Sequence, residues 1–210
     1  MVVANPKTLM SFQITRIHLD GLWATLTLGL ALGTVSYADA SLDYELVLYL
    51  AIHLATVILY LIRRPAIARS SHSLGYVVAC LSTTYIYLYD FDQTAAPEFT
   101  VGRAVMFIGL ALSLLSLLSL GRYFGVLPIS RGVQTAWMYR AVRHPVYASY
   151  ILMDIGLVAS YRSAWNVFLF FIGLALYVLR INYEELLLRR FADYRDYMTR
   201  VRFRLIPLIY

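Results

Sequence analysis

The residues best suited to chemistry begin with the run Arg143, His144 and Pro145, followed by Tyr147. Proline suits the first turn of a helix because its missing N–H has no intrahelical partner there, so Pro145 is expected to begin a helix. The free amides at such a helix start favour an anionic group, and the planar guanidinium of Arg143 is suited to binding a carboxylate. The run therefore predicts a site for an anion at a helix N-terminus, and plain helix capping by His144 is the structural alternative.

An acidic residue follows within the same predicted helix. Asp154 falls on one face with Tyr147 and Tyr150, at the spacing i, i+3 and i+7. An ionisable group inside an apolar segment is costly and usually faces a cavity or a partner. Asp154 is therefore a candidate for catalysis, and equally a candidate for helix packing against a tyrosine or an arginine.

A second polar cluster lies near the C-terminus, where Glu184 and Glu185 follow a long apolar segment. Acidic residues at a helix C-terminus oppose the helix dipole. We therefore expect the helix to continue past them, with Glu184 paired to Arg180 and Glu185 paired to Arg189.

An apolar and aromatic stripe follows this pair, formed by Leu187, Phe191, Tyr194 and Tyr197. This spacing predicts an amphipathic helix. Such a helix either lies on lipid headgroups or covers the long connection that contains the Arg-His-Pro run.

The elements that must position these residues are apolar helices. Of the 210 residues, 60% are hydrophobic and only 14% are charged, against about 25% charged in soluble domains. This composition excludes disorder, and a single cysteine excludes a disulfide-rich scaffold. A membrane crossing needs about 20 apolar residues, which predicts six spans over 20–37, 44–62, 74–90, 101–120, 146–161 and 164–182. We expect an all-α polytopic bundle forming one domain over 1–210, in which 1–100 has no assigned role and 121–207 carries the site.

The net charge of +6 has its simplest explanation in topology rather than in nucleic-acid binding. Lys7 and Arg16 precede the first predicted span, and six arginines from Arg189 to Arg204 follow the last. Basic residues are retained on the cytoplasmic side of a membrane, and only Arg103 and Arg162 fall on the opposite connections. The pattern predicts a multi-pass membrane protein with both termini cytoplasmic, and so compact a chain fits a bacterial inner membrane.

Other polar residues and small-residue spacings indicate structure rather than chemistry. His53 and His72 lack the spacing of metal ligands, so no metal site is expected. Cys80 lies in an apolar segment, where a thiol is most often a small packing residue. Gly29 and Gly33 have a spacing that permits close helix packing.

The C-terminal half of the chain resembles the isoprenylcysteine carboxyl methyltransferase family. The resemblance rests on motifs that follow one another in chain order: YRAVRHPVY, then the acidic pair, then the pattern F-x-x-Y-x-x-Y, which ends in an arginine-rich stretch and Pro207. That family is related to the integral-membrane phospholipid methyltransferases. The resemblance covers residues 122–207 and implies a methyltransferase that uses S-adenosylmethionine without a Rossmann-type domain. In agreement, no G-x-G-x-x-G run follows a predicted strand.

The resemblance also implies roles for individual residues, with a cofactor pocket on the cytoplasmic side. The residues that it places at the cofactor are Tyr139, Arg143, His144, Pro145, Tyr147, Glu184 and Glu185. Glu184 is the better match of the acidic pair, as an acceptor for the cofactor's ammonium or ribose hydroxyls. Arg143, Glu184 and Asp154 are the catalytic candidates. For an amine or thiol acceptor, the proton would go to Glu184, His144 or Asp154.

The chain departs from the family pattern at three places. Trp137 and Met138 stand where members often have Gly-Pro before the tyrosine, and Tyr150 replaces an acid that many bacterial relatives carry. The distance to Phe191 is one residue short, which places Tyr183 where a first Glu would lie. These departures leave open which Glu acts and whether the lipid-like or small hydrophobic acceptor presents a carboxylate, an amine or a thiol. Two other functions remain as alternatives, namely an NADPH-dependent membrane lipid reductase related to sterol reductases and a non-catalytic lipid-binding membrane protein.

Overall fold

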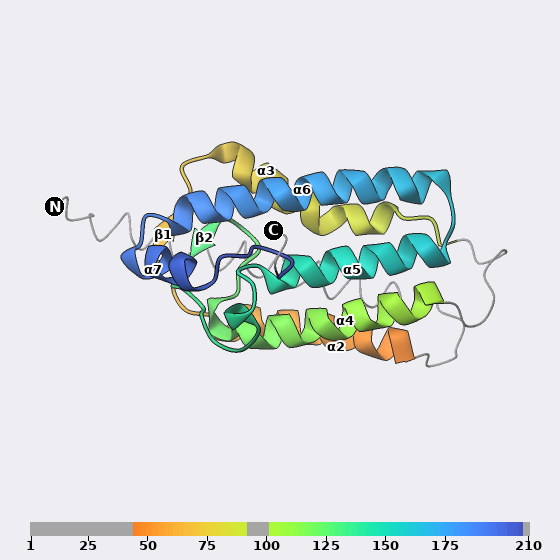
Figure 1. Ribbon diagram of the computed structural model, residues 1–210, viewed down its shortest axis with the longest axis horizontal. Helices are drawn as coiled ribbons and strands as arrows, with labels where there is room; N and C mark the ends of the chain where they lie inside the picture. Colours follow the sequence, from red (N-terminus) through yellow and green to blue (C-terminus); the bar gives the residue numbers. More distant parts are fainter. Residues whose placement is uncertain (1–43, 92–100, 208–210) are drawn as a thin grey trace. The chain divides into compact units, whose positions relative to one another are not determined.

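The computed structural model describes residues 44–91 and 101–207, and these ranges are mostly helical, as the sequence predicts (Figure 1). The α-helices are α2 (Tyr44–Ile62), α3 (Ser73–Thr84), α4 (Val101–Leu120), α5 (Pro145–Ser160), α6 (Ala164–Leu188) and α7 (Ala192–Arg200). The short 3₁₀ helices are η1 (Tyr85–Leu88), η2 (Gly121–Tyr123) and η3 (Trp137–Arg140), and the two-residue strands are β1 (Ala68–Arg69) and β2 (Ile129–Ser130). The chain divides into two compact units, residues 1–61 and 62–210.

The helices agree with the predicted spans where the two can be compared. α2 and α4 have the limits predicted for 44–62 and 101–120, and α5 and α6 begin within one residue of the predicted starts. Among the described residues, two helices are long and apolar enough to cross a membrane, α4 with its extension to Tyr123 and α6. The other apolar helices are shorter, so the count of six spans stays a prediction. The span at 20–37, with Gly29 and Gly33, lies outside the described residues.

Within the second unit, α5 packs between α4 and α6, and α3 packs on α6 (Figure 1). Because α4, α5 and α6 alternate in direction, the end of α4, the start of α5 and the end of α6 meet at one end of the bundle. β1 pairs there with β2 in antiparallel register, Ala68 opposite Ser130 and Arg69 opposite Ile129. At the opposite end, the buried Asn166 side chain joins the turn before α6 to the segment after η1, donating to Tyr161 O and Asp90 O at 2.8 Å each.

The contact between α4 and α5 is close because a glycine on each helix faces the backbone of the other helix. A Cβ added to Gly109 would meet the Met153 Cα at 2.6 Å, and one added to Gly156 would meet the Met106 Cα at 2.6 Å. The backbones touch at both crossings, as small residues allow in membrane helix pairs. This interface was not predicted, since the two glycines lie 47 positions apart and share no local motif.

Replacing Gly156 with leucine is expected to lower the free energy of unfolding by roughly 1–3 kcal/mol or more, because the added side chain meets backbone that cannot move aside. The measurement is thermal unfolding of the detergent-solubilised protein. Ala159→Leu is the matched control, since Ala159 is an exposed small residue on the same helix. Equal unfolding temperatures for the two variants would contradict the close contact.

α7 covers the connection between α4 and α5. Its buried residues Tyr194 and Tyr197 form a cluster with Tyr139 and Val201, and the Tyr197 hydroxyl donates to the Tyr139 carbonyl at 2.6 Å. Phe191, Tyr194 and Tyr197 of the predicted stripe pack here, which is the second of its two predicted roles, whereas Leu187 lies in α6, so the prediction of one helix that carries all four residues is wrong. α6 and α7 are separate helices, because the chain turns at residues 189–191.

Candidate functional site at the end of the bundle

The Arg-His-Pro run begins α5, as predicted, with His144 at the N-cap and Pro145 in the first turn. The His144 side chain makes no capping hydrogen bond. Instead, the backbone amides of Arg143 and His144 donate to the carbonyls of Phe203 and Arg204, both at 2.9 Å. We call residues 201–205 the C-terminal strap, because this segment lies across the start of α5.

Glu185 is the centre of a buried ion cluster at the strap. Its side chain is 1% exposed, and its Oε1 accepts from Arg143 Nε at 2.8 Å and lies 3.2 Å from His144 Nε2. Its Oε2 accepts from Arg189 and Arg204, each at 2.9 Å. The contact with Arg189 is the predicted i, i+4 pair. Three guanidinium groups therefore share one carboxylate, which holds α5, α6 and the strap together.

Glu184 faces a different environment from its neighbour. Its Oε1 accepts hydrogen bonds from the Tyr147 hydroxyl and from Arg180 Nε, the latter at 3.3 Å. Its Oε2 lies 3.9 Å from His144 Nδ1. The side chain is 23% exposed, whereas that of Glu185 is 1% exposed. Glu184 is therefore the carboxylate of the pair that a ligand can reach.

Arg180 stabilises the position of Glu184 through further contacts. The sequence predicted only its ion pair with Glu184. Its Nη1 donates to Ser82 at 2.9 Å and its Nη2 to the Val126 carbonyl at 2.6 Å, and its guanidinium lies 5.3 Å from the centre of the Tyr147 ring. All of these partners are distant in sequence. Arg180 thus fixes the position of Glu184 relative to α3 and to the α4–α5 connection.

Two tyrosines of the α7 cluster border the carboxylates. Burial first, and then the charge of Glu184, raise the pKa of the Tyr139 hydroxyl well above its ordinary value, so it stays protonated at neutral pH. Burial and the charge of Glu185 likewise raise the pKa of Tyr194. The Tyr194 hydroxyl is buried and has no hydrogen-bond partner among the described residues. Sequence reasoning placed Tyr194 in an apolar stripe and missed its position beside the site.

Asp154 lies two turns deeper along α5, away from the glutamates. It is 1% exposed and accepts a hydrogen bond from the Tyr85 hydroxyl, whose oxygen lies 2.9 Å from the Tyr177 hydroxyl and can accept a hydrogen bond from it. Tyr147 and Tyr150 stack near the same Tyr177, with ring centres at 5.8 and 5.9 Å. The predicted shared face of Tyr147, Tyr150 and Asp154 is thus confirmed, and it packs against α6. Within the described ranges, Asp154 Oδ1 has no partner.

The structure therefore brings most of the predicted site residues together and separates Asp154 from them. Tyr147, His144 and Glu184 meet directly. Arg143 lies beside them, but its Nε and Nη1 donate to Glu185 and to the carbonyls of Val201 and Arg202. Its predicted role as a binder of cofactor or acceptor stays a prediction, and its present contacts are those of a residue that positions the strap.

The apolar helices, with this carboxylate–arginine cluster at one end, define a helical, membrane-associated protein with a polar site at the end of its bundle. Residues 97–193, somewhat less than half of the chain, match the family model for phospholipid methyltransferases, the family that includes the isoprenylcysteine carboxyl methyltransferases. The matched segment holds both the Arg-His-Pro run and the acidic pair. A search of curated proteins found no significant match. The family match confirms the resemblance, supports a methyltransferase, and does not favour the reductase alternative.

Proposed function

We propose that the protein is an S-adenosylmethionine-dependent methyltransferase, similar to the isoprenylcysteine carboxyl methyltransferases, that acts on a lipid-like or small hydrophobic acceptor. The observation that carries the proposal is the contact between Tyr147 and Glu184, which joins two motifs 37 positions apart within the matched segment. Following the charge pattern, we place the site at the cytoplasmic face of a bacterial inner membrane, with both termini on that side.

The residues around Glu184 fit the polar groups of this cofactor. A partly exposed carboxylate held by Tyr147 and Arg180 can accept hydrogen bonds from an ammonium group or from ribose hydroxyls. The buried hydroxyl of Tyr194 has no partner among the described residues, and such a group calls for a ligand or a water molecule. Tyr147, which contacts Glu184, and Tyr139, which packs with Tyr194, add aromatic rings to this region. Glu184, Tyr147, Tyr139 and Tyr194 are therefore the residues that we expect to hold the cofactor.

The bound cofactor would supply a methyl group on a positively charged sulfur. The chain's own contribution is to orient the acceptor and to exclude water, since alignment of the reacting groups supplies much of the rate in such a transfer. The strap lies across the start of α5 beside Glu185, and we expect it, together with α7, to serve the second purpose. A carboxylate acceptor needs no base, whereas an amine or thiol would release a proton, for which Glu184 and His144 are the nearest candidates and Asp154 the more distant one.

The proposal is tested by thermal unfolding of the purified protein in detergent with the product S-adenosylhomocysteine. At about one hundred times its Kd, a ligand adds about 2.7 kcal/mol of stability, which for a chain of this size raises Tm by roughly 5–10 °C. NADPH at the same concentration is the control and is expected to leave Tm unchanged. Stabilisation by NADPH alone would support the reductase, and no shift with either ligand would support a non-catalytic protein.

A further inference from the structure

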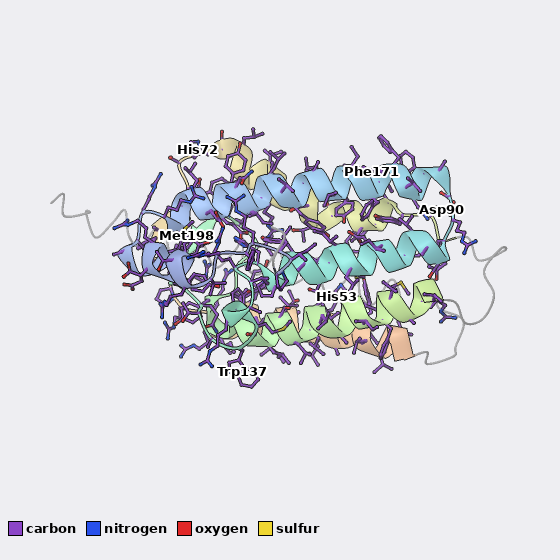
Figure 2. All side chains as sticks on the ribbon, in the orientation of Figure 1. His53, His72, Asp90, Trp137, Phe171 and Met198 are labelled. Carbon is purple, nitrogen blue, oxygen red and sulfur yellow. The ribbon has the colours of Figure 1, made fainter. Side chains whose placement is uncertain are left out.

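Trp137 is presented to the surroundings in an unusual backbone conformation. It begins η3, its side chain is 81% exposed, and Figure 2 shows it projecting outward from the loops beside the end of α4. Its φ of 55° lies in the left-handed region, and no other non-glycine residue in the described ranges has a positive φ. Bulky residues rarely adopt this region, and such strain persists only where the surroundings enforce it.

The surroundings of Trp137 hold the loop against the last turn of α4. The Gln134 side-chain amide donates to the Ser119 carbonyl, and its oxygen accepts from the Ala136 amide at 3.2 Å. On the other side, the Met138 amide donates to the Ser119 hydroxyl at 3.3 Å. The backbone is therefore fixed on both sides of Trp137, and this fixed geometry keeps the indole exposed.

Trp137 lies at an end of the bundle where polar and charged groups gather. α4 with η2 is one of the two helices long enough to cross the apolar layer, and its last turn is the one that holds the loop of Trp137. The ion cluster of Arg143 and Glu185 lies at the same end of the bundle. Arg140, in the same short helix as Trp137, is exposed. Among residues 121–144, Trp137 is the only exposed large apolar side chain.

We propose that Trp137 is a membrane anchor whose indole inserts among the lipid headgroups at the end of α4. Tryptophan suits this layer because its ring is apolar while its N–H donates a hydrogen bond, and it is enriched at membrane interfaces. The exposed Arg140 adds a cation that attracts lipid phosphate. A protein-binding surface is less well matched, since protein interfaces bury an apolar core of several residues, and here a single indole stands beside a charge. The proposal does not depend on methyl transfer.

The test uses the fluorescence of a variant in which Trp137 is the only tryptophan, made by Trp23→Phe and Trp165→Phe. The protein is reconstituted into phosphatidylcholine vesicles, with or without lipids brominated near the headgroup end of their acyl chains. We expect the brominated lipids to remove roughly half of the emission, as for an interfacial indole, and aqueous iodide to remove little. The same chain with Trp137→Phe in addition gives the tyrosine background.

Emission of a water-exposed indole, quenched by iodide and unaffected by brominated lipids, would overturn the proposal and leave a protein partner as the explanation. The Trp165 indole donates to the Leu88 carbonyl at 2.8 Å, so Trp165→Phe carries a risk to folding. Should that variant not fold, the difference in brominated-lipid quenching between the wild-type protein and Trp137→Phe gives the same answer. Trp137→Gly, which relieves the left-handed strain, is expected to unfold no earlier than the wild-type protein while lacking the anchor.

Discussion

Replacing Glu185 with alanine is expected to lower the free energy of unfolding by about 3–5 kcal/mol, the range for breaking a buried ion pair. The loss arises because Arg143 is buried and would keep its charge without a carboxylate partner. The contacts with Arg189 and Arg204 add less, since those side chains are 49% and 21% exposed and solvent screens them. The measurement is thermal or denaturant unfolding in detergent.

Glu184→Ala is the matched control for this experiment, because it removes the same group one residue away at a more exposed position. We expect it to cost clearly less stability than Glu185→Ala. If both variants unfold alike, the two carboxylates do not have the separate roles that their contacts indicate, and Glu185 is not the centre of the cluster.

Replacing Glu184 with glutamine is expected to weaken binding of S-adenosylhomocysteine roughly 10- to 100-fold, since a hydrogen bond to a charged group is worth about 1.5–3 kcal/mol. The glutamine oxygen can still accept from Tyr147 and Arg180, so the site should keep its shape and the protein its stability. Binding is measured by calorimetry and stability by thermal unfolding of the ligand-free protein.

Asp193→Asn is the control for charge alone, because Asp193 is an exposed acid at the start of α7. It should bind the ligand as the wild-type protein does. Unchanged affinity in Glu184→Gln, in a protein that binds the ligand before substitution, would contradict the role of Glu184 without contradicting methyl transfer. Absence of binding in the wild-type protein would instead contradict the proposed function.

The sequence predicts the helices well because their signals are local. The apolar run 101–120 gives the limits of α4, Pro145 marks the start of α5, and the spacing from Glu184 to Arg180 gives the continuation of α6. These features depend on residues within one or two turns of each other.

The different roles of Glu184 and Glu185 could not be predicted in the same way. Adjacent residues point about 100° apart around a helix, but which direction is buried depends on segments far along the chain. Glu185 faces the strap and Arg143, while Glu184 faces Tyr147 and the side of Arg180. The position of Tyr194 near Glu185 and the left-handed backbone conformation of Trp137 depend on equally distant contacts.

The strap also has a consequence for the order in which the molecule assembles. Arg143 and Val201 are 58 positions apart, whereas α5 and α6 are joined by a three-residue turn. Contacts between distant segments require a costly loop closure and gain stability only once the intervening helices have paired. The ion cluster is therefore expected to form late in folding: the hairpin of α5 and α6 forms first, and the returning chain then encloses Glu185.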